Sequence, residues 1–142
     1  MTAVTQRDWL LDDRLQPDAG HPALRPLFDA AARGALALPF CAACAIPLEL
    51  EQLVCDGCGS ADRVWREVPL AGVVHSATVM HRREAGLVVT EGPYPLIDVE
   101  TESGHRMIMT TAVATNRAPA IGDTVAIAFR RVGDVAVPAV HG

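Results

Sequence analysis

The chain has 142 residues and a net charge of −5, and half of its residues are hydrophobic, which suits one domain, or one domain with a small metal module, around a buried core. No segment reaches the roughly 18–20 apolar residues of a membrane span or shows the charged start and apolar run of a secretory signal, so we expect a cytoplasmic protein. The acidic charge, the lack of a basic block and the few aromatic residues argue against nucleic-acid binding, which needs cations for phosphates and rings for stacking.

The chain begins with a mixed arm that leads to a helix. In the arm, the apolar residues 9–11 precede charged residues and a turn at 17–20, so they could anchor the arm on this chain or on another. Residues 22–34 are predicted to form the helix, because Pro22 suits a first turn and Gly34 suits the end. The apolar residues recur at the i, i+3, i+4, i+7 spacing of one helix face: Leu24, Leu27, Phe28 and Ala31.

Four cysteines follow in two C-x-x-C pairs, with no thiol left over: Cys41 and Cys44, then Cys55 and Cys58. A predicted strand over 36–40 leads into the first pair, and a second short strand is predicted over 48–53, before the second pair. Residues 45–54 separate the pairs, which is fewer than the about 15–20 residues of the common zinc pattern. The short connection suits a small rubredoxin-like ribbon with two tight turns at the ends of adjacent strands.

The cysteine pairs predict a tetrahedral cage for one metal ion. Four protein ligands without an open position are typical of structural Zn²⁺, whose binding supports the folding of a segment too short to bury much apolar surface. Iron in the same cage, as a one-electron centre, is the second interpretation. Two disulfides or a redox C-x-x-C are the third, and the lack of a secretory signal and of a βαβ pattern weakens them. Gly57 and Gly59 can supply positive φ in the second turn, where the first turn has Ala43 and Ala45.

Beyond the cysteines the pattern predicts short strands joined by hairpin turns. The predicted strands are 64–68, 70–80, 96–101, 105–113, 124–131 and 135–140, with turns at 102–104, 121–123 and 133–134. No helical segment is long enough for a crossover, so the strands predict a small antiparallel barrel. Gly72 marks a bulge or a bend of the barrel. Residues 83–95 form the longest loop, and long loops on a rigid barrel often carry binding contacts.

The sequence offers little catalytic machinery, and no catalytic residue is predicted. Five histidines are scattered along the chain: His21, His75, His81, His105 and His141. Strict alternation would place His75 and His81 on one strand face as a possible site, although ordinary strand positions explain them more simply. Asp98, Glu100 and Glu102 alternate as a polar outer face. No serine has the setting of a nucleophile elbow.

One basic cluster is a candidate for ligand or partner binding: His81, Arg82 and Arg83. Guanidinium groups suit phosphate and carboxylate recognition, so the cluster could hold a CoA phosphate or an acidic patch on a partner protein. The alternative is that these residues form a solvated loop.

The order of helix, four-cysteine ribbon and small barrel resembles a family of small proteins in which a rubredoxin-like zinc ribbon is joined to an OB-fold barrel, long labelled a domain of unknown function and associated with acyl-CoA. The resemblance rests on residues 28–44 (FDAAARGALALPFCAAC), 55–59 (CDGCG), Trp65 leading into 72–76 (GVVHS), and 121–125 (IGDTV). It covers about residues 24–140. Ala45 stands where the family usually has glycine after the second cysteine.

The resemblance implies a mainly β chain, which we divide into an N-terminal arm and helix (1–37), a zinc ribbon (38–62) and an OB-fold barrel (63–142). Family members act as partners of thiolase-fold enzymes in acyl transfer, C–C condensation or retro-aldol cleavage, and the partner carries the reactive residues. The implied function is a non-catalytic accessory or scaffold subunit of such an acyl-CoA-processing hetero-oligomer, with structural Zn²⁺ and a CoA ester bound by the complex. The alternatives are a free-standing acyl-CoA-binding protein and, third, an iron-containing electron-transfer protein.

Overall fold

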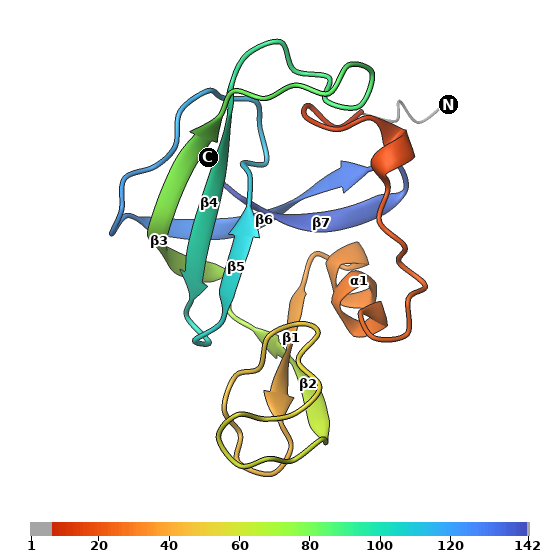
Figure 1. The fold of residues 1–142 in the computed structure, drawn as a ribbon, viewed down its shortest axis with the longest axis vertical. Coiled ribbons are helices and arrows are strands. Elements are labelled where there is room, and N and C mark those ends of the chain that lie inside the picture. The colour runs from red at the N-terminus through yellow and green to blue at the C-terminus, as the bar shows by residue number, and fades with distance from the viewer. Residues whose placement is uncertain (1–6, 142) are drawn as a thin grey trace.

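The chain folds into a barrel and a smaller two-stranded ribbon, with one α-helix beside the junction (Figure 1). A computed structural model describes residues 7–141; residues 1–6 and 142, at the two ends of the predicted division, lie outside it. The elements are η1 (Asp13–Leu15), α1 (Arg25–Ala32), β1 (Leu36–Cys41), β2 (Arg63–Val68), β3 (Ala71–Met80), β4 (Tyr94–Thr101), β5 (Arg106–Met109), β6 (Thr124–Val132) and β7 (Val135–Val140). No helix among the described residues is long and apolar enough to cross a membrane.

Five antiparallel strands form the barrel in the order β5-β4-β3-β6-β7. The two edges of this sheet meet just after β5, where Thr111 pairs with Val140 and the amide of Val140 donates to the carbonyl of Thr110 at 2.9 Å. The barrel is therefore nearly closed, which confirms the predicted mainly β architecture. Its interior is filled by apolar side chains from four of these strands and the end of β7: Val74, Ile97, Val99, Met109, Val125 and Val140.

The ribbon consists of β1 and β2, paired antiparallel from Leu36 opposite Val68 to Cys41 opposite Arg63. The strand predicted over 48–53 does not form, and this part of the chain contains turns. Pro47 forms an isolated bridge with Phe40 of β1, and further along the amide of Gln52 closes a turn by donating to the carbonyl of Glu49 at 3.1 Å. β2 is the second strand of the ribbon, paired with β1. The division at residues 37 and 62 stays a prediction.

A second core joins the helix, the ribbon and the barrel. Its buried members are Leu27 of α1, Leu36 and Leu38 of β1, and Ile127 of β6. Burying each such side chain stabilises the fold by about 1.5–3 kcal/mol, so a cluster drawn from three elements ties them together. The helix confirms the expected apolar stripe, because Leu27 and Ala31 face inward as the spacing predicts.

A bulge interrupts β3 at His75. The pairing of β3 with β4 shifts between Val74 and Ser76, and both Val74 and Ala77 pack into the barrel core although they lie three positions apart. A bulge adds one residue and resets the alternation of side chains. Strict alternation therefore does not relate His75 and His81: the bulge intervenes, and His81 follows the end of the strand, as the simpler interpretation had it.

Gly72 marks a close approach of two strands within the barrel, not the bulge itself. A Cβ atom at this position would lie 2.6 Å from the carbonyl oxygen of Glu100 and 2.6 Å from a methyl group of Val99. Gly72 pairs with both Thr101 of β4 and Val125 of β6. The missing side chain thus allows β3 to lie tightly against β4 at the point where it is shared by two strands, as predicted for a barrel bend.

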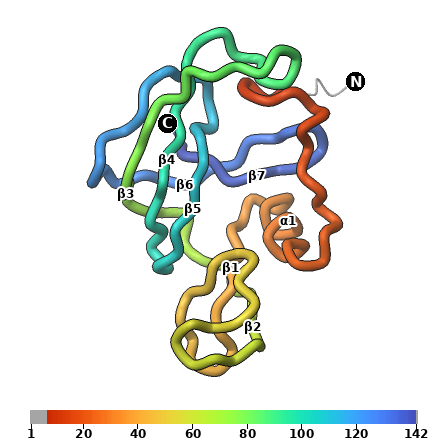
Figure 2. Tube along the Cα trace, viewed as in Figure 1, coloured from red at the N-terminus to blue at the C-terminus, as the bar shows by residue number. Residues whose placement is uncertain are grey.

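The N-terminal arm runs along the barrel beside the loop between β3 and β4 (Figure 2). Leu11 forms an isolated bridge with Val88 of that loop, and the indole Nε1–H of Trp9 donates to the carbonyl of Thr111 at 2.8 Å. Asp8 forms an ion pair with Arg130 of β6. The apolar anchor predicted at 9–11 is therefore used within this chain.

Candidate metal centre

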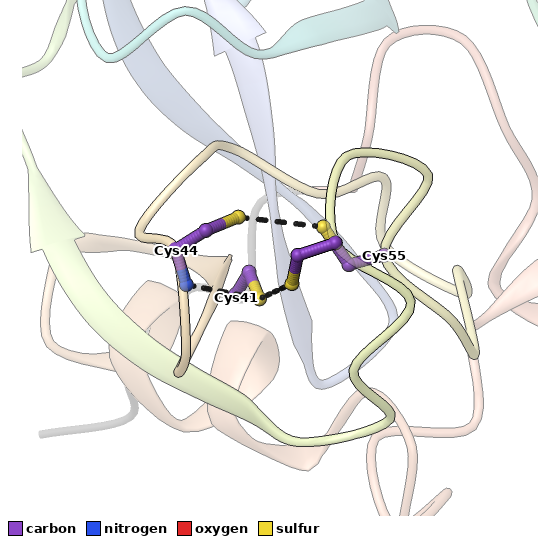
Figure 3. Close-up of side chains that lie close together, drawn as sticks. Cys41, Cys44 and Cys55 are labelled. Atoms are coloured by element: carbon purple, nitrogen blue, oxygen red, sulfur yellow. Dashed lines mark hydrogen bonds between the residues drawn. The ribbon is translucent and has the colours of Figure 1, made fainter.

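The two cysteine pairs lie at the far end of the ribbon, and their four sulfur atoms come together. Cys41 is the last residue of β1, and the other three lie in the two turns that face each other there. All four sulfurs lie within 4.8 Å of one another. Figure 3 shows Cys41, Cys44 and Cys55 turned toward one another around the same space. The structure thus confirms that the four cysteines form one group, as their spacing in the sequence predicts.

The distances between sulfurs suit a shared ion and not a disulfide. The sulfurs of Cys41 and Cys58 are 3.6 Å apart, as are those of Cys44 and Cys55. A disulfide requires about 2.05 Å. Sulfurs at about 2.3 Å from one tetrahedral ion lie about 3.8 Å apart, close to what the structure has. All four cysteines are free thiols in the structure, which argues against the disulfide interpretation.

The two turns repeat the same backbone hydrogen bonds. The amide of Ala45 donates to the carbonyl of Cys41 at 2.9 Å, and the amide of Gly59 donates to the carbonyl of Cys55 at 2.8 Å. Both residues are left-handed, with φ of 65° at Ala45 and 78° at Gly59. The expectation of positive φ is met at Gly59 but not at Gly57, and the first turn reaches the same geometry with an alanine.

Amide protons also point at two of the sulfurs. The amide of Cys44 donates to the sulfur of Cys41, and the amide of Gly57 donates to the sulfur of Cys55, each at 3.4 Å. Such donors favour the thiolate form. A side chain at Gly57 would come within 2.9 Å of Ile46, so the glycine allows this turn to sit close to the first one.

The closeness of the four sulfurs affects how the thiols ionise. The Cys44 amide lowers the pKa of Cys41 to about 6, against the effect of burial. At Cys44 the amide of Ile46 lowers the pKa, but burial and the three neighbouring sulfurs outweigh it and raise the pKa to about 12. One thiolate thus forms easily and makes the next one unfavourable. A divalent ion removes this conflict because it balances the negative charge.

The donor set fits a metal such as zinc. Four thiolates match the preference of Zn²⁺, and the same set also holds iron. Cys41 and Cys55 are buried, whereas Cys44 and Cys58 are exposed. Four protein ligands leave no position for a substrate, so a metal bound here would support the fold and not take part in catalysis.

The predicted basic cluster lies in an exposed loop directly after β3. His81, Arg82 and Arg83 are all exposed, and Arg82 pairs with Glu84 at 2.5 Å. The guanidinium group of Arg82 is therefore already paired with a carboxylate of the same loop. The binding role of the three residues stays a prediction.

Sequence analysis missed the part played by His105, which connects the barrel to the ribbon. The side chain is 5 % exposed, and its Nε2 lies 2.8 Å from the carbonyl oxygen of Pro39 in β1. A carbonyl can only accept, so Nε2 carries the proton and the neutral ring accepts at Nδ1 from the hydroxyl of Ser103, also at 2.8 Å. The ring of Phe40 meets the imidazole edge-on at 4.9 Å. Nothing local in the sequence signals these contacts, because Pro39 and His105 are far apart along the chain.

The pair of Ser103 and His105 resembles a nucleophile with its base, but both groups are already engaged. The serine hydroxyl also lies 2.8 Å from the hydroxyl of Thr101, and the second nitrogen of the imidazole is held by the ribbon. A catalytic pair needs a base that can pass its proton to substrate. The arrangement therefore fits a structural network that shapes the β4–β5 hairpin.

The fold of the chain is similar to that of known proteins. Residues 65–130 match a family model described as "ChsH2, C-terminal OB-fold domain". Among solved structures, a chain of the "Ltp2-ChsH2(DUF35) aldolase" aligns with a TM-score of 0.74 and 24% sequence identity, covering 89% of this chain and 98% of that chain. A search of curated proteins finds no match.

These likenesses agree with the geometry described above. The matched stretch runs from Trp65 of β2 into β6, and so contains most of the barrel. The solved chain shares the fold over nearly its whole length. The predicted resemblance to chains that join a cysteine ribbon to an OB-fold barrel is confirmed.

Proposed function

We propose that the chain is a non-catalytic subunit of a thiolase-fold enzyme complex that processes acyl-CoA compounds. The observation that carries this proposal is the shared arrangement of ribbon and barrel with a chain of the Ltp2-ChsH2(DUF35) aldolase. In this proposal the partner subunit supplies the reactive residues, and the complex binds the acyl-CoA ester. Acyl transfer, C–C condensation and retro-aldol cleavage are all compatible with such a partner.

The chain's own side chains support an accessory role. Among residues 7–141, the one group of clustered metal-ligating side chains is the cysteine cage. The buried histidine is held in a hydrogen-bond network, and the remaining histidines within these residues are exposed: His21, His75, His81 and His141. Catalysis requires a nucleophile, a base and an orienting group within reach of substrate. A supporting subunit needs none of these.

We propose that the cage holds structural Zn²⁺, bound by Cys41, Cys44, Cys55 and Cys58. The observation behind this assignment is the mutual spacing of the sulfurs together with the closed, four-ligand set. Zinc supplies no redox chemistry, so its part is to hold the two turns together. Iron in the cage would instead give a coloured protein and favour the electron-transfer interpretation.

The test is gentle purification of the tagged chain from its native cell, followed by identification of what accompanies it. We expect a thiolase-fold protein in near-stoichiometric amount and a complex that processes an acyl-CoA thioester. A monomeric chain that brings no such protein and binds CoA esters by itself would contradict the subunit proposal and favour the free-standing binder. Metal analysis of the same sample distinguishes zinc from iron.

A further inference from the structure

We propose that a groove formed by the ribbon, the segment before α1 and strand β5 is the surface on which the partner subunit docks. We further propose that the partner presents apolar side chains flanked by arginine or lysine. This inference rests on the proposed function, because it assumes that the chain works in a complex. The groove is named here by four apolar residues that line it: Leu24, Leu50, Met107 and Ile108.

The groove joins two hollows that share these four residues. The first has a volume of ≈ 540 Å³ and opens between the ribbon and β5, where Glu49 and Glu51 stand on one side and Arg106 on the other. The second has a volume of ≈ 300 Å³ and continues between the N-terminal arm, α1 and the barrel, with a lining that is mostly apolar. A surface that combines an apolar floor with a charged rim, at the meeting point of three structural parts, suits a protein ligand.

Ile108 is the apolar side chain most available for contact. It lies in the middle of β5 and is 75% exposed. β5 is the edge strand of its sheet, and among residues 7–141 no strand ladder runs along its outer side at Arg106–Met109. Edge strands are places where another chain readily adds contacts, and natural proteins usually protect them. The exposed Ile108 instead leaves the edge at β5 apolar and open to contact with another chain.

The charges around the groove favour a basic partner. Glu49 and Glu51 are exposed, and neither takes part in an ion pair within the described part of the chain. The nearby cation, Arg106, is neutralised by Asp98, to which its Nε donates at 3.1 Å. The two glutamates outnumber Arg63, whose guanidinium lies beside Leu50, so this part of the rim keeps a net negative charge, which would steer and orient a positively charged surface.

The groove is preformed because one arginine fixes both of its loops. Arg63 of β2 donates to the carbonyl of Leu50 at 2.9 Å and to the carbonyl of Ala23 at 3.2 Å. Leu50 and Leu24, the neighbour of Ala23, are thus held on the same side of the groove. His105 in turn holds β1 against the barrel, so the wall made by β5 keeps its place. A rigid surface loses little conformational entropy on binding.

The test uses the thiolase-fold protein that accompanies the wild-type chain and compares two matched variants. Ile108→Arg places a cation in the groove, and Ile121→Arg makes the same change at a residue that is 73% exposed in the turn before β6, away from the groove lining. Both variants are checked for metal content and for the wild-type circular dichroism spectrum. Binding of each to the isolated partner is then measured by biolayer interferometry.

We expect Ile108→Arg to weaken binding by at least about tenfold and Ile121→Arg to change it by less than about twofold. A second variant, Glu49→Arg/Glu51→Arg, should slow association and reduce its dependence on salt concentration. Equal binding by Ile108→Arg and wild type, or equal losses at both isoleucines, would overturn the docking site while the subunit proposal stands. Failure of the wild-type chain to bind any thiolase-fold protein would instead contradict the subunit proposal, and the docking site with it.

Discussion

At the scale of single residues, the two cysteine turns differ at one informative position. Ala45 and Gly59 donate equivalent hydrogen bonds and have nearly equal positive φ angles, but one carries a side chain. An L-residue with a Cβ atom strains in this conformation, whereas glycine does not. The first turn therefore holds strain that the second turn lacks. The cage still forms because its geometry depends on the four sulfurs and not on this residue.

Ala45→Gly is expected to stabilise the metal-loaded protein by about 0.5–1 kcal/mol. The left-handed conformation costs an alanine about 1–2 kcal/mol, and the greater freedom of glycine in the unfolded chain offsets about 0.5–1 kcal/mol of the gain. The converse variant, Gly59→Ala, should destabilise, and because no atom lies within 4 Å of its added Cβ, the effect is one of backbone conformation. Urea unfolding measures both changes. Equal stability of Ala45→Gly and wild type would show that the strain is relieved elsewhere.

Single cysteine substitutions test the cage. Cys41→Ser and Cys55→Ser each remove one of the two buried ligands, and we expect the bound metal to fall from about one ion per chain to well below half. The ribbon should unfold at lower temperature, with the chemistry of any surviving complex unchanged. Metal content by mass spectrometry and thermal unfolding are the measurements. A variant with full metal content and wild-type stability would contradict the metal site.

At the scale of elements, the N-terminal arm is attached through a buried ion pair. The Asp8 side chain is 1% exposed and pairs with Arg130, and it also accepts a hydrogen bond from the amide of Leu11 at 2.8 Å. Removal of one partner leaves the other buried without compensation, which typically costs about 3–5 kcal/mol. This pair therefore decides whether the arm stays on the barrel.

Arg130→Met is expected to destabilise the fold by about 3–5 kcal/mol, and Asp8→Leu/Arg130→Met should restore part of that loss because no charge stays unpaired. The exposed pair of Arg33 and Glu67 supplies the control: Glu67→Gln should cost less than about 1 kcal/mol. Unfolding in urea and limited proteolysis of the arm report the changes. Additive losses in the double variant would argue that the two groups do not interact.

His105 gives the junction of ribbon and barrel a dependence on pH. Burial lowers the pKa of this imidazole, although the hydrogen bond to the Pro39 carbonyl acts in the opposite direction. The folded protein thus binds the proton less readily than the unfolded chain does. Stability is present above the unfolded pKa of about 6.5 and falls as the pH drops below it.

His105→Gln is expected to lower stability at neutral pH by about 1–3 kcal/mol, since it disturbs a buried hydrogen-bond network, and to flatten the loss of stability between about pH 7 and 5. Subtraction of the two pH curves isolates this residue from the proton dependence of metal binding. His75→Gln replaces an exposed histidine and should keep the wild-type curve. A His105→Gln curve parallel to wild type would show that the imidazole is not the source.

At the scale of the whole molecule, the metal is expected to support the barrel as well as the ribbon. The cluster of Leu27, Leu36, Leu38 and Ile127 spans helix, ribbon and barrel, so disorder in the ribbon exposes apolar surface on the other two. The two tryptophans report on different parts: Trp9 bonds to the barrel at Thr111, and Trp65 lies in the ribbon. They therefore allow the two regions to be followed separately.

Metal removal by a strong chelator should lower the unfolding temperature reported by both tryptophans by at least about 3 °C, the shift that roughly 1 kcal/mol produces in a chain of this size. Trp65→Phe leaves Trp9 as the single reporter, and Trp9→Phe leaves Trp65. Fluorescence during heating, with and without chelator, measures each. If the Trp9 transition kept its midpoint while that of Trp65 shifted, the two parts would be independent.

The sequence by itself was enough to predict the features that depend on the spacing of residues close together in the chain. The cysteine pairs, the apolar stripe of the helix and the strands with their hairpin turns all follow from contacts between residues near one another in the chain. The cage could be predicted because each C-x-x-C turn presents its own two sulfurs, so one further contact between turns completes it. Positive φ at Gly59 follows from the same local geometry.

The tertiary structure alone decided which distant segments meet. β2 became the partner of β1, whereas the segment at Pro47 forms an isolated bridge with Phe40, and the bulge at His75 moved the later residues of β3 to new faces. The imidazole of His105 found the carbonyl of Pro39, and Ile108 came to stand beside Leu24 and Leu50, through the packing of ribbon against barrel. Such contacts join residues that are far apart in the chain. The alternation of side chains along one strand shows which residues face inward, but it carries no information about which distant surface they will meet.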